Sequence, residues 1–67
     1  MIKIKVNDKS LEIEKDFTIQ QLLSKIGSPQ DGIAVAINDS IVFKHLWDRR
    51  ILAENDKILI IQATQGG

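Results

Sequence analysis

The chain has 67 residues, the length of one small domain. Its nine basic and nine acidic residues give a net charge of zero, which speaks against a nucleic-acid partner, because proteins that bind nucleic acids carry a basic surplus. With no cysteine and one histidine, the chain has no thiolate nucleophile, no cysteine-based metal site and little acid–base equipment, so an enzyme is the least favoured class.

The N-terminal segment predicts a β-hairpin. Apolar and polar residues alternate over 2–6 and again over 11–14, which is the period of a half-buried strand, and turn-forming residues separate the two runs. The chain begins with this alternation, so we expect no secretory signal. No apolar run approaches the roughly 18 residues of a membrane span. We therefore expect a cytoplasmic protein.

The pattern changes to a helical period over residues 18–26. Thr18 followed by Gln21 has the spacing of a capping box. Gly27 can adopt the left-handed conformation that ends a helix, and Pro29 prevents continuation. The apolar positions of this segment share one helical face: Ile19, Leu22, Leu23 and Ile26.

Three more strands are expected in the second half of the chain. Residues 33–37 alternate, residues 41–43 form a short strand, and residues 58–61 are continuously apolar, as in a central strand. The resulting order is β-β-α-β-β-β in a single domain over residues 1–67.

The segment 44–50 is ambiguous in sequence. We expect Leu46 and Trp47 to cover the end of the core from a short helical turn. His45 has no partner at a useful spacing, so we expect it at the surface or at the edge of the core. Four aspartates fall in expected turns, where turn chemistry explains them without a metal: Asp8, Asp31, Asp39 and Asp56.

One helix can cover only one face of a sheet, so the other face is polar or serves as an interface. We expect Val35 and Ile37 to meet the helix. On the opposite face we expect an apolar patch that docks partner proteins, formed by Ala34, Ala36, Leu59 and Ile61. The alternative is that the crossing segment 44–53 simply covers this face.

The tail 63–67 breaks the strand pattern and ends in two glycines. Five extended residues would carry the terminal carboxylate about 17 Å from the body, at roughly 3.3–3.6 Å per residue. An enzyme that joins a carboxylate to AMP must align it with ATP in a narrow, dry site, and glycine brings no side chain that blocks the approach. We therefore expect Gly67 to be the reacting residue, and Gly66, Gln65 and Thr64 to thread into the partner's site.

In combination, these segments resemble the ubiquitin-like β-grasp sulfur carriers of the ThiS/MoaD family, and most closely those of thiamine biosynthesis. The short length fits that branch better than the longer molybdopterin-synthase subunits. The implied fold is α+β, with an approximately five-stranded mixed sheet, one main helix on one face, and a C-terminal tail. The resemblance covers essentially the whole chain and is carried by residues 4–7, 18–23, 34–38, 41–42, 47, 56–59 and 66–67.

The resemblance implies a function in sulfur transfer. An E1-like adenylyltransferase (ThiF) would use ATP and Mg²⁺ to adenylate the Gly67 carboxylate, and sulfur from a cysteine desulfurase-type donor would displace AMP to leave a thiocarboxylate. Thiazole synthase (ThiG) would then take up that sulfur. The chain itself would be a co-substrate that binds no cofactor or metal and performs no catalysis.

Two alternatives stay open. One is another sulfur-transfer pathway, such as molybdopterin synthesis. The other is a ubiquitin-like binding module whose glycines do not react. The polar segment 63–65 lacks the basic residues of the ubiquitin tail, which argues against a role in protein conjugation.

Overall fold

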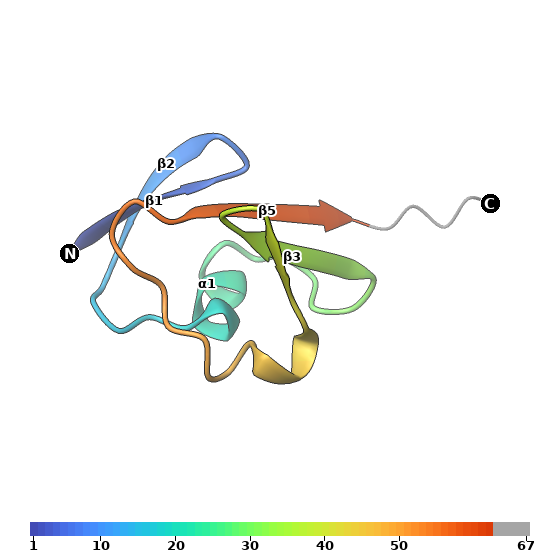
Figure 1. The fold of residues 1–67 in the computed structure, drawn as a ribbon. Coiled ribbons are helices and arrows are strands. Elements are labelled where there is room, and N and C mark those ends of the chain that lie inside the picture. The colour runs from blue at the N-terminus through green and yellow to red at the C-terminus, as the bar shows by residue number, and fades with distance from the viewer. Residues whose placement is uncertain (63–67) are drawn as a thin grey trace.

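The computed structural model describes residues 1–62, which form one five-stranded sheet with one α-helix packed against it (Figure 1). The predicted order of elements is confirmed. In chain order they are β1 (Ile2–Val6), β2 (Lys9–Ile13), α1 (Ile19–Lys25), β3 (Ile33–Ile37), β4 (Ser40–Val42), the 3-10 helix η1 (Lys44–Leu46) and β5 (Lys57–Gln62).

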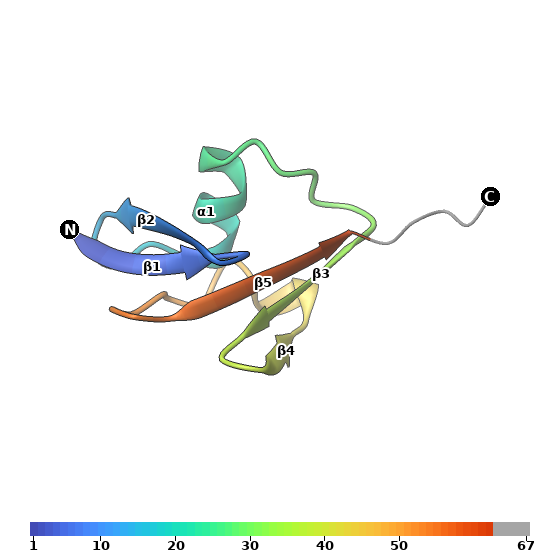
Figure 2. The ribbon, with the colours of Figure 1, turned by 90° about the horizontal axis from the view of Figure 1, so that it is seen from above.

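The strands lie in the order β2-β1-β5-β3-β4, so the last strand in the sequence is central in the sheet (Figure 2). β5 runs parallel to β1 and antiparallel to β3, which makes the sheet mixed as expected. The bounds of β2, β4 and β5 differ from the predicted ranges by one or two residues at each end. β4 begins at Ser40, because Ser40 pairs with Ile37 across a two-residue turn, and β5 begins at Lys57, which pairs with Lys5.

The ends of α1 are the ones that its sequence predicts. The backbone N–H of Gln21 donates to Thr18 Oγ1 at 3.2 Å, and the Gln21 side chain accepts from the Thr18 N–H at 2.9 Å. This reciprocal pair is a capping box. At the other end Gly27 is left-handed, with a φ of 71°, and the N–H of Ser28 bonds back to the carbonyl of Leu23.

The core lies between the sheet and α1. Val35 and Ile37 point into it, as predicted, and Trp47 is 2% exposed with its Nε1–H donating to the Val42 carbonyl at 2.9 Å. Trp47 is therefore the expected lid on the core. The prediction that Leu46 also covers the core is wrong, because this residue is 38% exposed. The buried residues of the hydrophobic core are Ile4, Ile13, Ile19, Leu22, Leu23, Val35, Ile37, Trp47, Leu52 and Ile58.

The segment 44–53 lies on the same side of the sheet as α1 (Figure 1). The N–H of Gln20 donates to the Trp47 carbonyl at 3.0 Å, and the N–H of Leu52 donates to the Phe17 carbonyl at 2.8 Å. These bonds hold the segment against the start of α1. The alternative in which it covers the opposite face of the sheet is therefore wrong.

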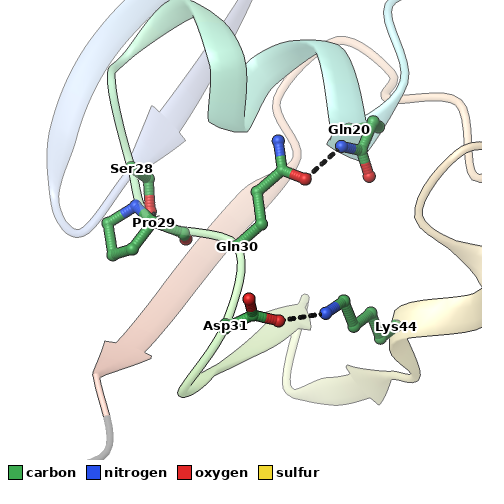
Figure 3. A network of polar contacts seen from close by, with 6 residues as sticks. All are labelled: Gln20, Ser28, Pro29, Gln30, Asp31 and Lys44. Atoms are coloured by element: carbon green, nitrogen blue, oxygen red, sulfur yellow. Dashed lines mark hydrogen bonds and ion pairs between the residues drawn. The ribbon is translucent and has the colours of Figure 1, made fainter.

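The loop 28–32, which connects α1 to β3, is held by polar contacts with α1 and with η1 (Figure 3). The Gln20 side chain donates to the Gln30 side chain, and Lys44 forms an ion pair with Asp31. The hydrogen bond from Lys44, together with its charge, lowers the pKa of the Asp31 carboxyl below its ordinary value. Both partners of this ion pair are solvent-exposed, so it orients the loop more than it stabilises the fold.

Candidate functional site

The face of the sheet opposite α1 carries an apolar patch. β3 and β5 place Ala34 opposite Ile61 and Ala36 opposite Leu59, so the four residues predicted from alternation do come together on one face. On the far side of β3, Ile41 of β4 is the register partner of Ala36 and extends the same surface. We call these five residues, Ala34, Ala36, Ile41, Leu59 and Ile61, the open-face patch.

The exposure of the patch differs between its large and small residues. Leu59 and Ile61 are each 49% exposed and Ile41 is 56% exposed, whereas Ala36 is only 6% exposed. Ala36 therefore faces the side opposite α1, as predicted, but it is itself buried. The exposed apolar area of the patch comes mainly from its three large residues.

Ile41 was not among the predicted patch residues. Its strand is only three residues long, so an alternating pattern is too short to assign its face from sequence. The signal that could have found it is the Asn38-Asp39 pair before the strand. Such a pair favours a two-residue hairpin turn, which fixes the register and hence the face of Ile41.

A hollow of about 390 Å³ lies beside the patch. Ala36, Ile41, Leu59 and Ile61 line it, together with charged residues of both signs at its rim: Asp8, Asp39 and Lys57. A shallow apolar surface with a mixed polar rim is typical of a protein-docking site.

The patch lies on the strand that leads into the tail. β5 carries Leu59 and Ile61 and ends at Gln62, directly before Ala63 in sequence. The predicted reacting and threading residues lie outside the described residues: Thr64, Gln65, Gly66 and Gly67. Chain connectivity alone therefore places the patch and the predicted reacting end on one continuous stretch of backbone.

His45 and the predicted turn aspartates have structural surroundings that account for them. His45 is exposed, and its ring stacks on that of Phe43 with the centroids 6.2 Å apart. Asp8 and Asp39 sit in turns with φ of 69° and 74°. The buried carboxylate of Asp56 accepts hydrogen bonds from the Ala53 N–H at 2.8 Å and from the Asn38 side chain at 3.1 Å.

Two other kinds of site are absent from the described part of the chain. No cluster of three or more His, Cys, Asp or Glu side chains within residues 1–62 is arranged to hold a metal ion. No helix in that same range is long and apolar enough to cross a membrane.

Comparison with known proteins identifies the family. The family model described as "ThiS family" matches residues 3–67, which is nearly the whole chain. The chain belongs to the ThiS family. The matched range includes the terminal Gly66-Gly67 pair, so the family pattern extends through the predicted reacting end.

A curated ThiS relative supports this assignment. The chain is 33% identical over 66 residues to a protein of Escherichia coli (strain K12) named "Sulfur carrier protein ThiS". The match covers 98% of this chain and 100% of the relative.

Solved structures of ThiS confirm the fold. The crystal structure of the thiamine biosynthesis protein ThiS from Geobacter metallireducens has a TM-score of 0.85 at 19% identity, covering 98% of this chain and 100% of that one. An NMR solution structure of a thiamine biosynthesis protein from the same organism has a TM-score of 0.78 at 17% identity, covering 98% and 88%. The ubiquitin-like β-grasp expected from the sequence is therefore the fold of this chain.

Proposed function

We propose that this chain is a sulfur carrier of thiamine biosynthesis and that its reacting group is the carboxylate of Gly67. The observation that carries the proposal is the match to the ThiS family, which extends from the first strand through the two terminal glycines. The name of the Escherichia coli relative supports the same role, because it describes that protein as a sulfur carrier.

The reaction begins with activation of a carboxylate that is by itself a poor electrophile. An E1-like adenylyltransferase (ThiF) joins the Gly67 carboxylate to the α-phosphate of ATP and releases pyrophosphate. The terminal sulfur of a persulfide on a cysteine desulfurase-type donor then attacks the acyl carbon, and AMP leaves. A thiol cleaves the S–S bond of the resulting acyl disulfide and releases the thiocarboxylate, whose soft sulfur is the nucleophile passed to thiazole synthase (ThiG).

In this scheme the chain is a co-substrate and not the catalyst. The activating enzyme supplies ATP, Mg²⁺ and the groups that stabilise the transition state, and the chain supplies a carboxylate on a backbone narrow enough to enter that enzyme's site. The need for ATP also supports the cytoplasm as the place of reaction.

We also propose that the open-face patch docks the activating enzyme and the synthase. The support is its exposure and its position on β5, the strand that continues into the tail. A partner that binds Leu59 and Ile61 holds the chain only a few residues from its reacting end, which raises the effective concentration of that end in the partner's site.

Intact-mass spectrometry tests the proposed function. After incubation with the E1-like enzyme, ATP, Mg²⁺, a desulfurase, cysteine and a thiol, the protein should be about 16 Da heavier, since sulfur replaces one oxygen of the C-terminal residue. The reaction without ATP and the chain lacking Gly67 are the controls, and neither should show the added mass. An unchanged mass in the complete reaction would contradict the carrier function.

A second assay separates the two pathways that a sulfur carrier can serve. The thiocarboxylate form should supply sulfur to thiazole synthase in a thiazole-forming assay. It should not supply sulfur to a molybdopterin-forming system. The reverse result would place the chain in molybdopterin synthesis.

A further inference from the structure

Two asparagine side chains bond to the backbone of β5, one on each side of the strand. Asn7 follows β1 and Asn38 follows β3, and each begins an Asn-Asp turn with positive φ at both residues. Val6 and Ile37, the residues directly before the two asparagines, are both register partners of Ile58, so the two turns flank β5 on its two sides.

Asn7 bonds to Ile60, in the half of β5 that leads toward the tail. Its backbone N–H donates to the Ile58 carbonyl at 2.9 Å, which is the last backbone bond from β1 to β5. A parallel ladder would next bond the N–H and the carbonyl of Ile60, but the chain turns away at Asn7. The Asn7 side chain takes both places: Oδ1 accepts from the Ile60 N–H at 2.8 Å, and Nδ2 donates to the Ile60 carbonyl at 3.3 Å.

Asn38 makes a contact of the same kind on the other side of β5. Its Oδ1 accepts from the Lys57 N–H at 3.0 Å, at the start of β5. The two asparagines therefore share backbone conformation and an acceptor role toward β5. They differ in the partner of the amide nitrogen, which is the Ile60 carbonyl for Asn7 and the Asp56 carboxylate for Asn38. Asn38 is therefore a control for loss of a side-chain contact with the start of β5.

We infer that Asn7 is a positioning residue for activation of the C-terminal carboxylate, an inference that rests on the proposed function. Ile60 lies three positions before Ala63, so its backbone is close in sequence to the start of the tail. β3 holds this end of β5 on one side, and the Asn7 side chain holds it on the other. Without the side chain, the last residues of β5 have one neighbour instead of two, and the reacting end samples more directions.

The kinetic signature of this role differs from that of destabilisation. Asn7 also lines the hollow beside the open-face patch, so KM for the carrier does not separate positioning from docking. The signature of positioning is a lower kcat, because fewer of the complexes that form have the carboxylate aligned. A partly unfolded carrier behaves in the opposite way. It lowers the concentration of competent carrier, which raises the apparent KM and leaves kcat unchanged.

The test compares Asn7→Gly with Asn38→Gly, because glycine retains the positive φ of either turn and removes only the side chain. Pyrophosphate release by the E1-like adenylyltransferase is measured against carrier concentration, and amide hydrogen exchange is measured by NMR. We expect Asn7→Gly to lower kcat about 3- to 10-fold and to speed exchange at Ile60 about tenfold, as for loss of one ordinary hydrogen bond. Asn38→Gly should speed exchange at Lys57 and leave kcat at the wild-type value.

Equal kcat values for the two glycine variants would overturn the inference. If Asn7→Gly does not fold, Asn7→Asp takes its place, since it keeps the acceptor for Ile60 and loses the donor. A kcat below that of the wild-type chain then supports the role, and an unchanged kcat overturns it. Failure of the wild-type chain itself to release pyrophosphate would refute the proposed function and is thus distinguishable from failure of this inference.

Discussion

Trp47 is the residue that covers one end of the core. It is the largest of the fully buried side chains, and its one polar atom is bonded to the Val42 carbonyl. The indole therefore fills apolar volume without leaving an unsatisfied donor. It also connects the segment after β4 to the sheet on the side where α1 packs.

Replacing Trp47 by phenylalanine should lower the free energy of unfolding by about 1–3 kcal/mol, because the change removes both the hydrogen bond and part of the packed volume. Urea denaturation followed by circular dichroism measures this. Phe43→Leu is the control at an aromatic residue that is 64% exposed, and it should change stability by less than about 0.5 kcal/mol. Equal effects of the two variants would contradict the role of Trp47 as the lid.

Among the elements, α1 is the one whose ends are determined most locally. Thr18 and Gln21 exchange hydrogen bonds at its start, and Gly27 permits the left-handed residue at its end. A helix of seven residues has little intrinsic stability in water, so its caps and its buried face have to hold it together.

Thr18→Ala should therefore destabilise the protein by about 1 kcal/mol, since the first turn loses the acceptor for the Gln21 N–H. The midpoint of a urea titration should shift down at constant slope. Ser24→Ala lies on the exposed side of the same helix and should leave the midpoint unchanged or raise it slightly. A midpoint for Thr18→Ala that equals the wild-type value would contradict the capping role.

The elements were predictable from sequence because their signals are local. Alternation assigned Val35 and Ile37 to the core side, and the capping spacing located the start of α1. The side-chain bonds of Asn7 and Asn38 could not be predicted in the same way, because they join residues that are 53 and 19 positions apart. The prediction for Leu46 was wrong for a related reason: a single 3-10 turn has too few residues for a pattern to indicate which of them is buried.

At the scale of the whole molecule, the two faces of the sheet differ in how they are covered. α1 and the segment 44–53 cover the first face, and Leu59 and Ile61 stay half-exposed on the second. A domain this small buries only about 60% of the surface of its unfolded chain. Exposed apolar residues on its central strand lower its solubility, and an interface on this face would account for them.

Leu59→Lys should raise KM for the carrier in the adenylation assay about tenfold or more, because it places a charge in the centre of the open-face patch. The unfolding midpoint should stay close to that of the wild-type chain, since Leu59 is not part of the core. Ile51→Lys is the matched control: Ile51 is 50% exposed but bridges to Thr18 on the helix side, away from the patch. A KM that is the same in both variants would contradict docking through the patch.

The central position of β5 has a consequence for how the chain can change in length. The side chains of a strand alternate between its two faces, and each residue adds about 3.3 Å. One residue inserted between Leu59 and Ile61 would turn one of these two side chains from the open face to the core face, whereas an insertion in the loop 28–32 would leave both on the open face. The length of β5 is therefore constrained more tightly than the length of that loop.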